Sequence, residues 1–200
     1  RDYRELGLGY ANLGALLMVS GLPYDSQEGR LLAAQVTSLM CGQAYCMSAL
    51  IADIKGPYAG FSLNREPQLN VIAMHLNEAE QVYSEALQSA VVDRDLHIAS
   101  RLVWYEALEL GKKYGVRNSQ MTVLAPTGTI AFMMDCDTTG VEPDIALVKY
   151  KKLVGGGTLK LVNGQVAPAL RHLGYSEEQV QDITAYLLEH DTIEGAPHLR

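Results

Sequence analysis

The chain has 200 residues, a length that fits one domain or a large piece of one. Hydrophobic residues make up 48% of it, which is enough for a sizeable core and excludes a disordered chain. The formal net charge of −7, without any run rich in lysine and arginine, argues against a surface that binds duplex DNA.

The cysteine pattern points to a reducing compartment, because the number of cysteines is odd and the composition is that of an ordinary globular protein. We therefore expect a cytoplasmic protein. Cys41 and Cys46 lie about 140° apart on a helix of 3.6 residues per turn, which favours two buried small residues over a metal or redox pair. None of the five histidines shows a metal-ligand spacing, so no metal site is expected. The chain starts without a methionine, and we expect it to be part of a longer protein.

The first half of the chain predicts helices. Leu13, Leu16 and Leu17 have the spacing of a helix face. The uncharged run 31–52 is long enough to span a bilayer, which takes about 20 apolar residues, but its polar side chains favour a helix buried in the core of a soluble protein. Ser26 is the expected N-cap of this helix, and Gly56 follows its end.

Three further helices are expected before the middle of the chain. Asn64 can cap a helix that starts at Arg65, has Pro67 in its first turn and continues to His75. Separate helical patterns then cover 77–91 and 94–114, and Gly111 or Gly115 closes the last one.

The run Q-M-T-V-L-A-P-T-G-T-I that follows predicts a strand at 120–124, which Pro126 ends because proline lacks an N–H donor. Thr127, Gly128 and Thr129 then form a turn before a possible helix start. Outward N–H groups and two hydroxyls in such a turn make a good cradle for an anion, and Gly128 allows close approach of a ligand. A phosphate-bearing substrate is the first interpretation, and a plain β-turn is the alternative.

A dense acidic segment comes next, and it makes the plain turn less favoured. It holds four carboxylates and a thiol, and loops rich in such groups often carry function. These residues are Asp135, Cys136, Asp137, Glu142 and Asp144.

The last quarter predicts a glycine-broken extended segment at 152–163 and two helices. The three successive glycines 155–157 favour a flexible turn over a phosphate loop, since no G-K-[ST] follows. Helices are expected at 166–173 and, after a capping box at Ser176, through about Glu189. The whole is a helix-rich α/β pattern with few strands, as in one part of a large barrel.

Six segments, in order and along nearly the whole chain, resemble the adenosylcobalamin-dependent (class II) ribonucleotide reductases. The block M-M-D-C-D-T-T-G-V-E-P-D is the most specific of them. The matching segments are 6–18, 21–26, 114–130, 133–144, 147–157 and 193–199.

The resemblance implies that residues 1–200 are a segment of a single catalytic domain, a ten-stranded α/β barrel shared with glycyl-radical enzymes. It implies reduction of ribonucleotides to deoxyribonucleotides by a thiyl radical that adenosylcobalamin generates. The implied partners are a ribonucleotide substrate, an external thiol reductant and nucleotide effectors that bind outside this segment, with a homodimer possible and neither a membrane nor DNA. Diphosphate and triphosphate substrates both stay open.

The resemblance also assigns site residues. The A-P-T-G-T-I match implies the substrate-phosphate loop, which consists of Ala125, Pro126, Thr127, Gly128, Thr129 and Ile130. For Asp135, Cys136, Asp137, Glu142 and Asp144 two roles stay open: ordering their own loop, or lining the active-site and cofactor-facing mouth.

The radical cysteine of the family is expected upstream, so these 200 residues are expected to be inactive alone. The resemblance implies a threonine and an alanine near the positions of Cys41 and Cys46, so no redox role is assigned to these two cysteines. Cys136 lies in the D-C-D block of the family, but the radical cysteine belongs to a different loop, so a redox role for Cys136 is the less favoured alternative. Two alternatives remain: a non-catalytic nucleotide-binding or assembly module derived from the same barrel, and a glycyl-radical relative.

Overall fold

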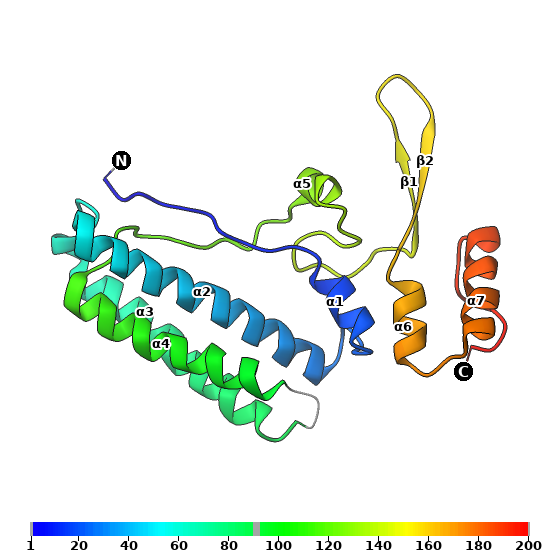
Figure 1. Cartoon of the computed structure of the whole chain (residues 1–200). Coiled ribbons are helices and arrows are strands. Elements are labelled where there is room, and N and C mark those ends of the chain that lie inside the picture. Colours follow the sequence, from blue (N-terminus) through cyan, green and yellow to red (C-terminus); the bar gives the residue numbers. More distant parts are fainter. Residues whose placement is uncertain (1, 90–92, 200) are drawn as a thin grey trace. The chain divides into compact units, whose positions relative to one another are not determined.

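The structure is a computed structural model that describes residues 2–89 and 93–199 (Figure 1). Its contacts divide the chain into two compact units. The first contains residues 2–9 and 25–125, apart from 90–92, and the second contains residues 10–24 and 126–199.

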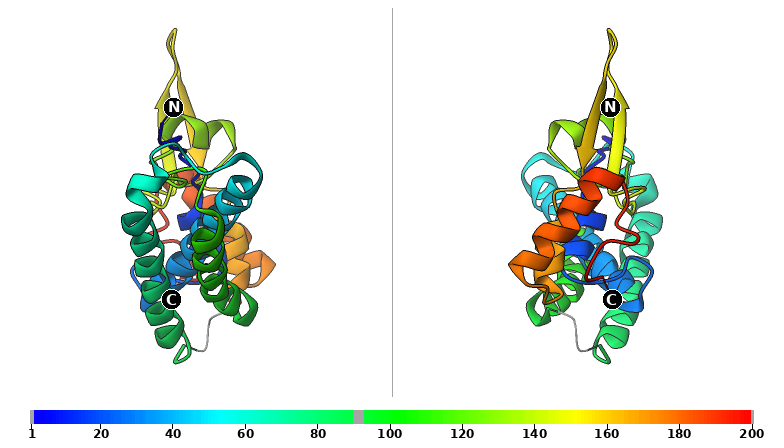
Figure 2. Two further views of the ribbon diagram at one scale, coloured as in Figure 1. Left: turned by 90° about the vertical axis from the view of Figure 1, so that its left-hand side faces the viewer. Right: turned by 90° about the vertical axis from the view of Figure 1, so that its right-hand side faces the viewer.

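Three long helices make up most of the first unit: α2 (Gln27–Lys55), α3 (Phe61–Ala86) and α4 (Arg94–Tyr114). They lie side by side, as both views of Figure 2 show. Their core is aromatic at its centre, where the Tyr45 and Trp104 rings are 5.5 Å apart and His75 stacks on Trp104 at 4.8 Å. The buried side chains around them include Cys46, Ala49, Ile72, Val103 and Ala107.

Helix α2 begins and ends as its sequence predicts. The Ser26 hydroxyl accepts a hydrogen bond from the Gly29 N–H at 2.9 Å, and Gly56 terminates the helix at φ 75°. The helix is only partly buried, however, because one face at i, i+3, i+4 and i+7 spacing is exposed. That face consists of Met47, Leu50, Ile51 and Ile54. No helix in the described ranges is long and apolar enough to cross a membrane.

Helix α3 corrects one prediction and α4 confirms another. The predicted break near residue 76 is wrong, because α3 runs on to Ala86 and Asn77 lies on its exposed side. The irregularity is instead at Asn64 (φ −114°, ψ 15°), whose side chain donates to the Gly60 carbonyl. The predicted end at residue 91 lies outside the described residues. The predicted range 94–114 is confirmed for α4, which ends at Gly115 rather than at Gly111.

The predicted strand at 120–124 is wrong as a regular strand. The segment is extended and forms one isolated parallel bridge, between Thr122 and Leu8. Three backbone hydrogen bonds join residues 6–8 to residues 120–123, and segment 6–8 is the one neighbour that pairs with 120–123 in the described residues. This ladder of hydrogen bonds is too short to make a regular strand. Within the described residues the one sheet has two strands, so the helix-rich α/β character is present but a ten-stranded barrel is not shown by this chain.

The second unit combines short helices with a hairpin. Its elements in chain order are α1 (Leu13–Val19), α5 (Gly128–Met133), β1 (Val148–Lys152), β2 (Thr158–Val162), α6 (Val166–His172) and α7 (Glu177–His190). Helices α6 and α7 end close to the predicted boundaries, and the capping box at Ser176 and Gln179 is confirmed. The core of this unit joins the base of the hairpin to α6 and α7 through Val148, Val166, Leu170, Val180, Ile183 and Leu187.

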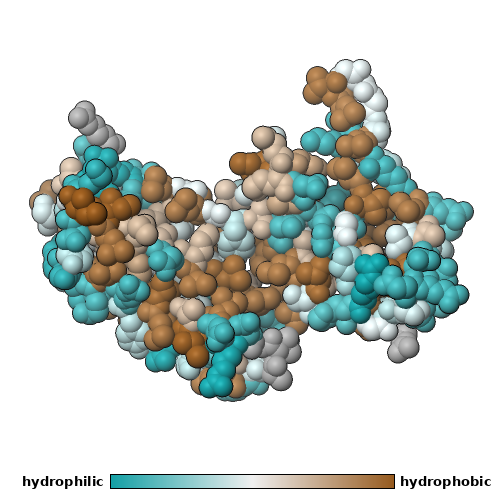
Figure 3. Space-filling model, viewed as in Figure 1, coloured by the Kyte–Doolittle hydropathy of each residue, from teal (hydrophilic) through white to brown (hydrophobic). Residues whose placement is uncertain are grey.

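The predicted extended segment at 152–163 is the turn and second strand of the hairpin. Strands β1 and β2 are antiparallel, with Val148 opposite Val162 and Lys152 opposite Thr158. The glycines 155–157 form the turn, all with φ between 94° and 99°, a backbone region open mainly to glycine. Figures 1 and 2 show that the hairpin extends beyond the other elements of its unit. Its tip exposes Leu153 and Val154, where Figure 3 shows apolar residues at the surface.

Candidate functional site

The predicted phosphate loop leads directly into α5. The first hydrogen bond of this helix runs from the Ala131 N–H to the Thr127 carbonyl at 2.7 Å. The N–H groups of Gly128, Thr129 and Ile130 precede it, and all three residues are exposed. Nothing lies within 4 Å of the place where a Cβ of Gly128 would be. The loop therefore presents backbone donors to an open space that an anion can enter.

Thr127 is bound differently from Thr129. Its hydroxyl oxygen accepts a hydrogen bond from the Gly140 N–H at 2.7 Å, which ties the loop to the acidic segment. Thr127 also has a positive φ of 55°, an unfavourable conformation for a β-branched residue that costs about 1–2 kcal/mol. Thr129 lies exposed in the first turn of α5. Thr129 therefore offers an exposed hydroxyl to a ligand, whereas the Thr127 oxygen links the loop to Gly140 and leaves the hydroxyl hydrogen of Thr127 as a donor.

Of the other predicted loop residues, Pro126 and Ile130 are exposed in the second unit. Ala125 is the last residue of the first unit. Residues 126–130 of the loop therefore all belong to the second unit.

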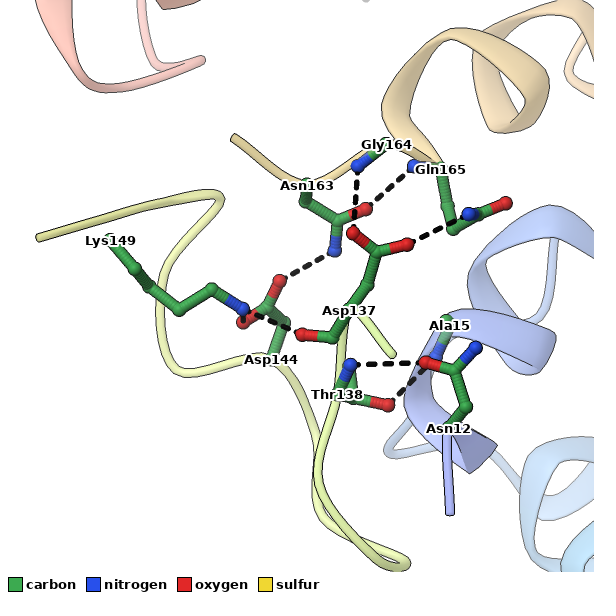
Figure 4. A network of polar contacts seen from close by, with 9 residues as sticks. All are labelled: Asn12, Ala15, Asp137, Thr138, Asp144, Lys149, Asn163, Gly164 and Gln165. Carbon is green, nitrogen blue, oxygen red and sulfur yellow. Dashed lines mark hydrogen bonds and ion pairs between the residues drawn. The ribbon is translucent and has the colours of Figure 1, made fainter. Parts of the chain in front are cut away.

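Two carboxylates of the acidic segment point inward and are hydrogen-bonded (Figure 4). Asp144, whose side chain is 6% exposed, forms an ion pair with Lys149 at 2.7 Å and accepts a hydrogen bond from the Asn163 amide. Asp137 accepts one from the Gly164 N–H at 2.8 Å and one from the Gln165 amide at 2.7 Å. These contacts order the loop, which is one of the two roles that the sequence left open for these residues.

The other members of the acidic segment lie differently. Asp135, with φ 56°, and Glu142 are exposed. Cys136 is half-buried, and its sulfur lies 3.9 Å from the Met134 carbonyl. Asp135 and Glu142 are therefore the two carboxylates whose side chains are accessible to a ligand.

Sequence reasoning missed the polar partners of this segment. Lys149 reads as one of several surface lysines in K-Y-K-K, and Asn163 reads as part of a turn with Gly164. Asn12, which accepts the Thr138 N–H at 3.1 Å, is distant in the chain. We find no sequence signal that would have identified them.

The remaining cysteines lie in the first unit, where Cys46 is buried and Cys41 is half-buried. Burial raises the pKa of Cys41, although its hydrogen bond with the Thr122 hydroxyl at 3.1 Å works in the opposite direction. Burial and the nearby Glu106 raise the pKa of Cys46 to about 11. Both are protonated at neutral pH, and a thiol rather than a thiolate is a poor redox nucleophile. The predicted burial is confirmed for Cys46, whereas Cys41 is only half-buried.

A family model described as the barrel domain of ribonucleotide reductase matches residues 1–200 of this chain. The chain belongs to the ribonucleotide reductase barrel family. The resemblance seen in its motifs is thereby confirmed.

Relatives with the same printed name are about half identical to the chain, and a more distant one is 24% identical. The vitamin B12-dependent ribonucleotide reductase of Streptomyces coelicolor is 50% identical over 200 residues, which is all of this chain and 20% of that protein. The enzyme of the same name from Agrobacterium fabrum is 49% identical over 98% of this chain and 16% of its own length. The alpha subunit of a ribonucleoside-diphosphate reductase from Chlamydia pneumoniae is 24% identical over 92% of this chain. The chain thus spans about a fifth of the length of the Streptomyces relative.

Proposed function

We propose that this chain is part of a vitamin B12-dependent ribonucleotide reductase and that its loop 126–130 binds the phosphates of the substrate. The observation that carries the loop assignment is the exposed set of N–H groups at Gly128, Thr129 and Ile130, beside the open space at Gly128. The proposal for the whole protein draws on relatives that bear the name vitamin B12-dependent ribonucleotide reductase at about 50% identity, among them those of Streptomyces coelicolor and Agrobacterium fabrum.

The proposed reaction replaces the 2′-hydroxyl of a ribonucleoside diphosphate or triphosphate by hydrogen. Adenosylcobalamin supplies the radical when it is bound, and an external thiol system supplies the electrons. The radical cysteine belongs to a part of the parent protein outside these 200 residues. In this scheme the loop binds the phosphates and thereby holds the ribose in a fixed position, which lowers the entropic part of the barrier without any bond change at the loop.

Two carboxylates of the acidic segment are already engaged within the protein. Asp137 and Asp144 already accept hydrogen bonds from neighbouring groups. Asp135 and Glu142 are exposed. We therefore propose that any contact between this segment and the substrate or cofactor is made by these two carboxylates.

The enzyme class is tested with the full-length parent protein. We expect deoxyribonucleotide to form from ribonucleotide plus a dithiol only when adenosylcobalamin is added. Absence of product with nucleotide still bound would favour the non-catalytic binding module instead.

The loop is tested by Thr129→Val in the parent protein. A hydrogen bond to a charged group contributes about 1.5–3 kcal/mol, so the KM for the ribonucleotide should rise roughly tenfold to a hundredfold. Thr158→Val, at an exposed threonine of the hairpin, is the matched control and should leave KM unchanged. Equal KM values for the two variants would contradict the phosphate-loop assignment.

A further inference from the structure

Lys149 joins the two ends of the acidic segment. Its ammonium group donates to the backbone carbonyl of Asp137 at 2.6 Å and to the carboxylate of Asp144 at 2.7 Å. The Lys149 side chain is 22% exposed and that of Asp144 is 6% exposed, so the pair is shielded from water. A single side chain of β1 therefore sets the distance between positions 137 and 144 (Figure 4).

The start of α6 completes the ring around this lysine. The side-chain amide nitrogen of Asn163 donates to the Asp144 carboxylate. The side-chain oxygen Oδ1 of Asn163 accepts a hydrogen bond from the backbone N–H of Gln165 at 2.7 Å. The Gln165 side chain returns to the Asp137 carboxylate at 2.7 Å. Such a closed ring of partly buried hydrogen bonds has few alternative arrangements, so the segment it encloses is held in one conformation.

The enclosed segment also contacts α1 and the loop that precedes it. The Thr138 N–H donates to the Asn12 side chain at 3.1 Å, and the Thr138 hydroxyl accepts the Ala15 N–H at 3.3 Å. At Gly14 a Cβ would lie 2.7 Å from the Glu142 carbonyl oxygen, so the two backbones touch. The acidic segment is thus fixed from two sides.

The one side-chain hydrogen bond in the described structure that runs from this segment to the phosphate loop is the Gly140 N–H to the Thr127 hydroxyl. Thr127 needs such support, because its left-handed backbone is unfavourable for a threonine. Its φ and ψ decide the direction in which the N–H groups of Gly128 and Thr129 point. The position of Gly140 is therefore a determinant of the geometry of the phosphate loop.

We propose that Lys149 and Asp144 are positioning residues for phosphate binding: their ion pair holds Gly140 where it fixes Thr127, and thereby aims the loop at the substrate phosphates. This inference rests on the proposed function of the loop. It assigns no contact between either residue and the substrate.

The experiment uses the full-length parent protein with the variants Lys149→Met and Lys149→Arg. Lys160→Met is the matched control, because Lys160 lies on the other strand of the same hairpin and forms an ion pair of the same 2.7 Å length with Asp191. We expect Lys149→Met to raise the KM for the ribonucleotide about tenfold with a much smaller change in kcat. Lys149→Arg keeps the positive charge and should raise the KM less than Lys149→Met does. Affinity for the nucleoside without phosphates should stay as in the wild type, which a general loss of structure would not allow.

The possible results separate the two proposals. If Thr129→Val raises KM but Lys149→Met behaves as Lys160→Met does, the positioning role is wrong and the phosphate loop stands. If neither variant changes KM, the phosphate loop itself is wrong and the positioning role falls with it. Equal losses of nucleotide and nucleoside affinity in Lys149→Met would also overturn the positioning role.

Asp144→Asn decides the question if Lys149→Met does not fold. It keeps the shape of the side chain and an oxygen for Asn163 but removes the charge that faces Lys149. We expect a rise in KM of at least about threefold with nucleoside affinity unchanged. A KM equal to that of the wild type in this folded variant would overturn the inference.

Discussion

His97 is a buried histidine of the first unit that is held in its neutral form. Its side chain stacks on Tyr83, with ring centroids 4.1 Å apart, and its Nδ1 lies 3.0 Å from the Gln35 amide nitrogen. Because that amide nitrogen can only donate, Nδ1 accepts and the ring proton is on Nε2. Burial, and to a smaller extent the Arg101 charge, lower the pKa of His97 below its usual value of 6.5.

This shift predicts a loss of stability in mild acid. Above pH 6.5 the histidine is neutral in both the folded and the unfolded chain, and it contributes no pH dependence. Below pH 6.5 the unfolded chain binds the proton more readily, so the free energy of unfolding falls until the pH passes the lower folded-state pKa. His97→Gln, which stays neutral, should show a smaller drop in melting temperature between pH 7 and pH 5 than the wild type. Melting curves at both pH values check this, and equal drops would contradict it.

Residue type alone predicted the turn at 127–129 but not the residues that contact it. Threonine and glycine after a proline predict a turn with free donors, and the structure has such a turn at 127–129. The assignment of Thr127 as a donor to the ligand stays a prediction, since its oxygen accepts from Gly140 and its hydroxyl hydrogen can still be donated. The role of Lys149 could not be predicted, because a lysine near the surface has many possible partners and only the fold selects among them.

The N-caps of α2 and α7 could be predicted from nearby residues, but the length of α3 could not. Ser26 and Ser176 accept the expected N–H groups, at 2.9 Å and 3.3 Å, because a cap depends only on residues three positions away. The predicted end near residue 76 failed, because Asn77 is exposed and no cap or proline interrupts α3 there. The segment 120–124 has the composition of a strand, but strand formation depends on neighbours elsewhere in the chain, and the described residues supply one.

Gly42 tests the close packing of α2 against α4. A Cβ at this position would lie 2.4 Å from Val103 Cγ1, and Val103 is a buried, β-branched side chain with little freedom to move. We expect Gly42→Ala to lower the free energy of unfolding by about 1–2 kcal/mol, since overpacking outweighs the gain of about 1 kcal/mol in helix propensity. Urea unfolding measures the change, and Gln43→Ala, at the exposed neighbouring position, is the control. A Gly42→Ala protein as stable as the control would show that the two helices separate easily.

At the scale of the whole molecule, apolar side chains that are exposed in ordered elements need a partner. The α2 face of Met47, Leu50, Ile51 and Ile54 is a continuous helical stripe, and Ile54 is 83% exposed. Figure 3 shows brown, apolar residues on the surface of the three-helix unit.

We therefore predict that the 200 residues expressed alone associate or have poor solubility. Light scattering after size exclusion should show species larger than the 21.8 kDa chain. Leu50→Gln with Ile54→Gln should reduce the association, whereas Gln43→Ala should not. A monodisperse monomer that melts cooperatively would contradict the prediction.

Local features of the chain could be predicted from the sequence, and long-range contacts could not. Helix N-caps, glycine turns and family membership could be predicted because each depends on a short stretch of residues, or on short motifs in a set order. The network around Lys149 includes contacts between residues as far as 28 positions apart, and the Asn12–Thr138 contact joins residues 126 positions apart. Such contacts exist only after α1, the hairpin and α6 have packed, because hydrogen bonds require their donor and acceptor to be within about 3 Å of each other. The network around Lys149 and the exposed face of α2 therefore became visible only in the tertiary structure.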